Sequence, residues 1–173
     1  MRRGLLRCGA VAGLVVAAGC VPVRTAPATG PAPEALAASL SGMIWPLPLT
    51  GRETVTSSYG VRGRRHHDGV DIDGRTGDPV FAAREGEVIF SGWRNGYGNT
   101  VVLDHGRGVT TLYAHASALF VRPGERVARG QRIAAVGATG NARGDHLHFE
   151  IAWAGVAIDP VPLLPELRRP ATR

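Results

Sequence analysis

The chain has 173 residues, of which 20 are basic and 14 acidic, giving a formal net charge of +6. This length suits one domain with short appendages and excludes two full hydrophobic cores. All of the basic residues are arginines, and they are scattered along the chain instead of forming a stripe, so nucleic-acid binding is not expected. The 24 glycines, set among runs of valine, isoleucine and threonine, disfavour a helix bundle and favour short strands joined by turns.

The N-terminal residues have the pattern of an export signal. A short basic start precedes an apolar run over residues 8–19, which is shorter than the ~20 residues that a membrane-spanning helix needs. The run ends at Cys20 after two alanines and a glycine, and this ending resembles the lipobox of bacterial lipoproteins, whose cysteine is lipidated and becomes the new N-terminus. We therefore expect residues 1–19 to be a lipoprotein signal peptide and Cys20 to carry a membrane anchor. The alternatives are an ordinary signal peptide cut near Ala26 or Ala28, or a buried free cysteine.

Residues 20–43 are dominated by alanine, proline, threonine and serine. Such a composition buries too little apolar surface to offset its ordering entropy, so we expect a tether. Residues 34–40 favour a turn or two of helix, but this is too short to be stable in isolation. We place the folded domain at residues 44–162 and a C-terminal tail at residues 163–173.

Short runs of β-branched and aromatic residues alternate with glycine-rich turns from Val80 onward. Strands at this spacing, with turn residues between them, indicate antiparallel pairing and not a βαβ fold. We therefore expect an all-β fold, a compact antiparallel β-sheet barrel or sandwich. The expected strands span residues 80–83, 87–93, 100–104, 109–114, 131–136 and 146–153.

Polar and apolar residues alternate with a period of two in the last of these strands. His146, His148 and Glu150 fall on one face of the strand, and the intervening apolar residues fall on the other. Two imidazoles side by side on one strand can chelate one metal ion, or one can bind the ion while the other transfers protons.

A second polar pattern is formed by His67 and Asp71, four residues apart. Gly69 between them disfavours a helix, so we expect a strand on which the missing side chain of Gly69 leaves space for an ion. Together with His148 these residues form a His2Asp set of nitrogen and oxygen donors, which suits Zn2+ and leaves a fourth position open for water. An open position is typical of catalytic zinc, which lowers the pKa of the water to about 7 and polarises a carbonyl.

The remaining histidines divide into two groups. His66 competes with His67 as a ligand, but its spacing of five to Asp71 places it on the wrong face of a strand. For His66 and His105 we expect the ordinary role of polar side chains satisfied by hydrogen bonds. His115 lies on another expected strand, and we expect it to join the site.

Taken together, these motifs resemble the lysostaphin-type zinc metallopeptidases that cut peptidoglycan. The resemblance covers about residues 45–160 and rests on His-x-x-x-Asp, Tyr-x-His and His-Leu-His-Phe-Glu, linked by Gly-Asp-Pro-Val-Phe-Ala-Ala and Gly-Tyr-Gly-Asn. It implies the compact antiparallel β fold of that family, a duplicated hybrid motif, with the site in a groove. It also implies functional roles. One Zn2+ is bound by His67, Asp71 and His148, while His115 and His146 assist the attacking water or stabilise the tetrahedral intermediate.

Two departures from the family pattern bear on the groove. Asp145 stands where the family has proline or another small residue, and we expect its charge to act on a nearby imidazole or on substrate entry. Only four residues separate Arg62 from His67, so we expect a minimal loop there and an open groove.

The resemblance implies a zinc metalloendopeptidase that hydrolyses cross-links or stem peptides of peptidoglycan during cell-wall remodelling, in contact with division or remodelling partners. It implies a cell-envelope location, lipid-anchored through Cys20 in the outer membrane and facing the periplasm, because Val21 and not aspartate follows the cysteine. One alternative is a non-catalytic, wall-bound activator of peptidoglycan amidases. Relatives of that kind have lost ligands, whereas this chain has all five site residues. A phosphocarrier that uses two histidines is a third alternative, but it has no need of Asp71.

Overall fold

The computed structural model describes residues 33–48 and 55–164 of the chain. The expected signal peptide over residues 1–19, Cys20, and most of the expected tether and tail lie outside the described residues. No helix in the described part of the chain is long and apolar enough to cross a membrane.

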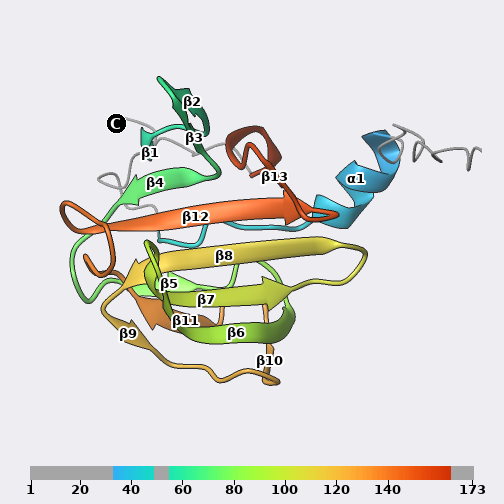
Figure 1. Ribbon diagram of the computed structural model, residues 1–173. Coiled ribbons are helices and arrows are strands. Elements are labelled where there is room, and N and C mark those ends of the chain that lie inside the picture. The colour runs from blue at the N-terminus through green and yellow to red at the C-terminus, as the bar shows by residue number, and fades with distance from the viewer. Residues whose placement is uncertain (1–32, 49–54, 165–173) are drawn as a thin grey trace, which may run out of the picture. The chain divides into compact units, whose positions relative to one another are not determined.

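Antiparallel strands make up almost all of the regular structure (Figure 1), which confirms the expected all-β fold. Within residues 33–48 and 55–164, the main sheet has eight strands: in spatial order β1 (Val55–Ser57), β4 (Val70–Asp73), β12 (His146–Trp153), β8 (Val109–Ala116), β7 (Gly98–Asp104), β6 (Gly86–Arg94) and β10 (Arg126–Val127), with β13 (Val156–Ile158) paired to β12. The second sheet consists of β5 (Pro79–Phe81), β11 (Arg132–Ala135) and β9 (Ala118–Leu119), and a separate hairpin consists of β2 (Gly60–Arg62) and β3 (Arg65–His67).

Strand β12 occupies the centre of the region that carries the expected site. Along one edge it pairs with β8; along the other it pairs first with β4 and then, at its C-terminal end, with β13. In this register His148 lies opposite Asp71 on β4 and opposite Ala114 on β8. Directly opposed residues of antiparallel strands share a face of the sheet. The register therefore brings Asp71 and His148 onto one face.

The core lies between the main sheet and the three-stranded sheet. Tyr113 and Phe149 of the main sheet and Val80 and Ile133 of the small sheet are all fully buried in one apolar cluster. Apolar side chains alternate along the strands, so one face of each sheet enters this core while the other face is left for polar residues. The core thereby fixes the positions of the strands beneath the site.

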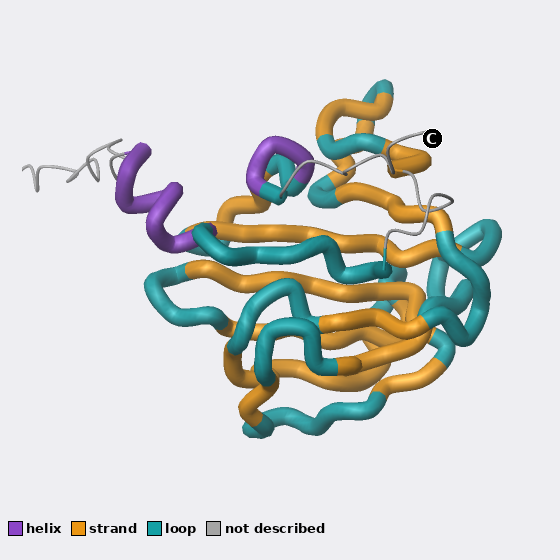
Figure 2. The backbone as a smooth tube through the Cα atoms, turned by 180° about the vertical axis from the view of Figure 1, so that it is seen from behind, coloured by secondary structure: helices purple, strands orange, loops and turns teal. Residues whose placement is uncertain are grey.

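The packed core begins at Leu40, before the domain start expected at residue 44. Helix α1 (Pro33–Leu40) ends in this buried leucine, and Met43 and Leu47 follow it into the core. A helix this short gains its stability from packing and not from its own hydrogen bonds. Figure 2 distinguishes the two helical segments, α1 and the 3-10 turn η1 (Val161–Leu163), in purple from the strands in orange.

The prediction that His67 and Asp71 lie on one strand is wrong. Strand β3 ends at His67 and β4 begins three residues later, so the two residues belong to different sheets. A Cβ atom on Gly69 would lie 2.3 Å from the carbonyl oxygen of Phe149 and 2.8 Å from Cγ of Glu150. Gly69 is therefore required by the close approach of β12 and not by the space an ion needs.

Candidate metal centre

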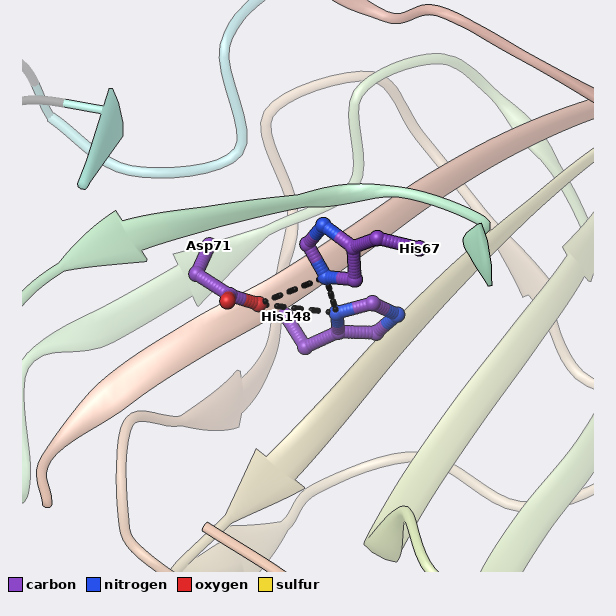
Figure 3. Close-up of side chains that lie close together, drawn as sticks. All are labelled: His67, Asp71 and His148. Carbon is purple, nitrogen blue, oxygen red and sulfur yellow. Dashed lines mark hydrogen bonds and ion pairs between the residues drawn. The ribbon is translucent and has the colours of Figure 1, made fainter. Parts of the chain in front are cut away.

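Three side chains from three strands meet above the main sheet: His67 from β3, Asp71 from β4 and His148 from β12 (Figure 3). His67 Nε2 lies 3.1 Å from Asp71 Oδ1 and 3.1 Å from His148 Nδ1. His148 Nδ1 lies 2.9 Å from the same carboxylate oxygen. The structure thus brings together the three residues that the sequence nominated as a ligand set.

The spacing of these three atoms fits a zinc ion. A tetrahedral ion with bonds of about 2.0–2.1 Å holds neighbouring donors about 3.3 Å apart, close to the separations found here. Two imidazole nitrogens and one carboxylate oxygen, without a thiolate, form a common donor set of catalytic zinc. The residues present therefore fit the ion and leave a fourth position for a water molecule or substrate.

The charges around Asp71 keep its carboxylate ionised. Burial alone would raise the pKa of Asp71, but the hydrogen bond with His148 and the nearby imidazoles of His67 and His146 outweigh burial and hold the pKa well below its usual range. Arg62 on β2 adds a further positive charge, with Nη2 3.4 Å from Asp71 Oδ2. An ionised carboxylate is the form that binds a cation.

Sequence reasoning did not assign a role to Glu150, which holds the ring of His148 from behind. Glu150 Oε1 accepts hydrogen bonds from His148 Nε2 at 2.9 Å and from the Tyr97 hydroxyl at 2.8 Å. Burial would lower the pKa of His148, but its hydrogen bonds to Asp71 and Glu150 raise it. A carboxylate that accepts the second ring proton fixes the tautomer of a metal-binding histidine. Glu150 therefore directs Nδ1 of His148 toward the three-donor cluster.

The other two expected site residues, His115 and His146, lie side by side with ring centroids 4.8 Å apart. His115 Nδ1 donates to the carbonyl oxygen of Thr139 at 2.8 Å, and His146 Nδ1 donates to that of Gly144 at 2.9 Å. In each ring this arrangement leaves Nε2 free of a backbone partner, and His146 Nε2 lies 3.7 Å from Asp71 Oδ1.

The backbone and the burial of His115 set it apart from its neighbours. Its φ of 63° is in the left-handed region, which residues other than glycine rarely occupy. Burial lowers the pKa of His115, so the ring is neutral at ordinary pH and its Nε2 can accept a proton.

The residues of the site fall within a region that matches a known protein family. The family model described as Peptidase family M23 matches residues 65–160, more than half of the chain, and these residues include all five expected site residues. The chain belongs to peptidase family M23. Its expected resemblance to the lysostaphin-type peptidases is thereby confirmed.

Several curated relatives of this M23 chain carry different functional names. The chain is 37% identical over 142 residues to the lipoprotein NlpD/LppB homolog of Pseudomonas aeruginosa, covering 80% of this chain and 45% of the relative. It is 34% identical over 152 residues to the murein hydrolase activator NlpD of Salmonella typhimurium, covering 83% and 39%. It is 42% identical over 113 residues to the DD-carboxypeptidase/endopeptidase Mpg of Neisseria gonorrhoeae, covering 62% and 26%. The chain thus spans less than half the length of these relatives.

Among solved structures, the antimicrobial peptidase lysostaphin from Staphylococcus simulans shares the M23 fold of this chain. The two superpose with a TM-score of 0.60 at 34% sequence identity, covering 65% of this chain and 48% of lysostaphin.

The M23 site lies in an open groove with a volume of about 760 Å³. All five expected site residues line it, together with Arg62, Arg65, His66, Asp68, Gly96, Tyr97, Asn141, Ala142, Arg143 and Glu150. The β2–β3 hairpin borders the groove through a two-residue turn, in line with the minimal loop expected there.

Three polar residues outside the donor cluster have structural partners. His66 Nδ1 lies 2.8 Å from Asp68 Oδ1, and His105 bonds to the Glu85 carbonyl and to Thr111, as expected for satisfied polar groups. Asp145 Oδ2 accepts the backbone N–H of Thr76 at 2.8 Å and does not line the groove. Asp145 thus anchors the loop before β12, and the effect of its charge on a nearby imidazole or on substrate entry stays a prediction.

Proposed function

We propose that this protein is a zinc-dependent endopeptidase that hydrolyses peptide bonds in the cross-links or stem peptides of bacterial peptidoglycan. The observation that carries this proposal is the presence, in one groove, of a complete three-donor cluster and two imidazoles whose Nδ1 atoms are held by backbone carbonyls. Membership in peptidase family M23 and the similarity to an endopeptidase of Neisseria gonorrhoeae support a hydrolytic role.

His67, Asp71 and His148 would hold the zinc ion. When bound, zinc lowers the pKa of a coordinated water and polarises the scissile carbonyl. His115 is suited to accept the proton of the attacking water through its neutral Nε2. The Nδ1 proton of its neighbour His146 is donated to the Gly144 carbonyl, so Nε2 carries a proton only in the imidazolium form. In that form His146 is suited to donate a hydrogen bond to the oxygen on which negative charge develops. As the C–N bond breaks, the proton held by His115 passes to the leaving amine.

The test combines metal analysis with digestion of isolated cell walls. Purified protein should contain about one zinc ion per chain and release cross-linked muropeptide fragments from sacculi, identified by mass spectrometry. His146→Ala should retain the metal and lose the activity. Protein that binds no zinc, or sacculi that stay intact at high enzyme concentration, would exclude the proposal.

A second candidate function is activation of other murein hydrolases. It is favoured by the 34% identity to the murein hydrolase activator of Salmonella typhimurium. The complete donor cluster and the paired histidines favour catalysis, because an activator that only binds its partner needs neither. Mixing the protein with a purified peptidoglycan amidase distinguishes the two functions. An activator raises amidase turnover, and its His146→Ala variant raises it as well.

We further propose that Cys20 carries a lipid that anchors the protein to the outer membrane, facing the periplasm. The lipobox-like ending at residues 17–20 supports this, as does similarity to a relative named a lipoprotein. Metabolic labelling with a fatty-acid analogue should mark the wild-type chain and not Cys20→Ala, and the label should sediment with outer-membrane vesicles. Recovery of wild-type protein unlabelled in the soluble fraction would contradict this location.

A further inference from the structure

The charged side chains that line the groove are unequally paired. All three carboxylates have close cationic or hydrogen-bonding partners: Asp68 with His66, Asp71 with the donor cluster, and Glu150 with His148 and Tyr97. None of them is therefore free to neutralise another positive charge in the groove.

Two of the three arginines in the groove remain without a partner. Arg62 interacts with Asp71, whereas the side chains of Arg65 and Arg143 make no hydrogen bond or ion pair within the described part of the chain. Both are exposed. Arg65 lies on β3 and Arg143 on the loop that precedes β12, so the two guanidinium groups reach the groove from separate segments.

The three arginines and three carboxylates that line the groove balance in formal charge. Because the carboxylates are already engaged, the guanidinium groups of Arg65 and Arg143 are left for a ligand, and a bound zinc ion would add two positive charges beside them. Guanidinium groups bind carboxylates through two parallel N–H···O bonds, a geometry that a lysine cannot offer. Such a groove attracts a peptide with free carboxylates and gives no advantage to an uncharged peptide.

We propose that Arg65 and Arg143 form a carboxylate-binding site that selects anionic peptides, in which free carboxylates lie close to the scissile bond, over neutral peptides such as glycine bridges. This inference rests on the proposed endopeptidase function, since it names the substrate class of the same groove. Exposed ion pairs are worth little individually, so each arginine should contribute no more than about fivefold in selectivity.

The experiment compares two synthetic stem peptides that differ only in having carboxylates or carboxamides beside the scissile bond. With zinc-loaded full-length protein, kcat/KM should be about tenfold higher for the acid peptide, and the ratio should fall as salt is raised. Arg65→Gln with Arg143→Gln should bring the ratio close to one. Arg122→Gln removes an exposed arginine that does not line the groove and should leave the wild-type ratio. Equal cleavage of both peptides by the wild type, or an unchanged ratio in the double variant, would overturn the inference.

Binding measured by calorimetry keeps this inference separate from the proposed function. His146→Ala, titrated with each peptide, should also prefer the acid peptide, and adding the two arginine substitutions should remove the preference. A wild type that binds the acid peptide through the arginines but cuts neither peptide would refute the endopeptidase function and uphold the carboxylate site. Equal binding of both peptides would refute the carboxylate site, whatever the activity.

Discussion

At the scale of single residues, the geometry of the metal cluster depends on a side chain that does not belong to it. Glu150 accepts the Nε2 proton of His148, and the Tyr97 hydroxyl, whose pKa burial and the Glu150 charge raise to about 12, donates to the same oxygen. The chain Tyr97–Glu150–His148 therefore sets which imidazole nitrogen of His148 faces the other two donors.

Replacing this carboxylate should weaken metal binding. We expect Glu150→Gln to lower zinc affinity about 10- to 100-fold, because an amide binds and orients the His148 ring less strongly than a carboxylate. Competition with a chromogenic chelator measures this affinity. Glu125→Gln makes the same chemical change on an exposed turn and should bind zinc as the wild type does. Equal affinities of the two variants would remove Glu150 from this role.

His115 offers a test of chemistry apart from metal binding. Asparagine tolerates the left-handed backbone that His115 adopts, so His115→Asn should preserve the fold. Loss of the proton acceptor should lower kcat about 10²- to 10⁴-fold while the zinc content stays near one per chain. Single-turnover kinetics measures the rate of the chemical step, and metal analysis measures the zinc content. His105→Asn, a histidine outside the groove, serves as the control; full activity of His115→Asn would show that His115 transfers no proton.

Residue chemistry made part of the site predictable. Alternation along residues 145–151 placed His146 and His148 on one face, and the same alternation includes Glu150, so its position was visible although its function was not. No periodicity marks Tyr97, which lies in the β6–β7 turn and reaches Glu150 across 53 residues of sequence. The partners of Asp145 could not be predicted either, because Thr76 is distant in sequence.

At the scale of elements, the long strands and two short ones, β5 and β11, were predictable, whereas the other short strands were not. Strands β6, β7, β8 and β12 have seven to nine residues, enough for the two-residue period to emerge. Strands β9 and β10 have two residues each and are defined by their pairing with β11 and β6. The break between β3 and β4 was missed for the same reason, since each is too short to show where a strand ends.

The contact between Gly69 and β12 should be sensitive to a single methyl group. Gly69→Ala places a Cβ against the Phe149 carbonyl and should lower the free energy of unfolding by about 1–3 kcal/mol. It should weaken zinc binding as well, because Asp71 and His148 are carried by the two strands forced apart. Denaturant unfolding measures the first effect and chelator competition the second.

A matched substitution on another strand serves as the control. Gly92 has a negative φ, and a Cβ there would meet only Phe90 Cζ at 3.7 Å, so Gly92→Ala should change stability by less than about 0.5 kcal/mol. Similar stability of the two alanine variants would show that β12 does not approach Gly69 closely in solution.

At the scale of the whole molecule, a chain of polar groups that is buried at Tyr113 and Thr111 links the main sheet to the segment before β6. The Ala83 N–H donates to the Tyr113 hydroxyl at 2.8 Å, the hydroxyls of Tyr113 and Thr111 are 3.0 Å apart, and Thr111 lies 2.8 Å from His105 Nε2. At the other nitrogen, His105 donates to the Glu85 carbonyl at 2.7 Å. Burial lowers the pKa of His105, so the folded protein keeps it neutral.

This chain predicts a pH dependence of stability. Unfolded histidine binds a proton near pH 6.5, whereas folded His105 binds it only at lower pH, so its stabilising contribution is complete above pH 6.5 and decreases as the pH falls. Between pH 7.5 and 5.5, at saturating zinc, the wild type should therefore lose more stability than His105→Gln, which has no proton to gain. Thermal unfolding of both proteins across this range gives the comparison, and parallel curves would contradict the prediction.

The pairing of β12 with β4 joins parts of the chain that are synthesised at well-separated times. Asp71 and His148 are 77 residues apart, and His67 and His148 are 81 residues apart. A chain that ends anywhere before His148 offers at most two of the three donors. The three-donor cluster is therefore complete only once β12 has inserted between β4 and β8. A partly folded chain that lacks this strand pairing carries no assembled donor cluster.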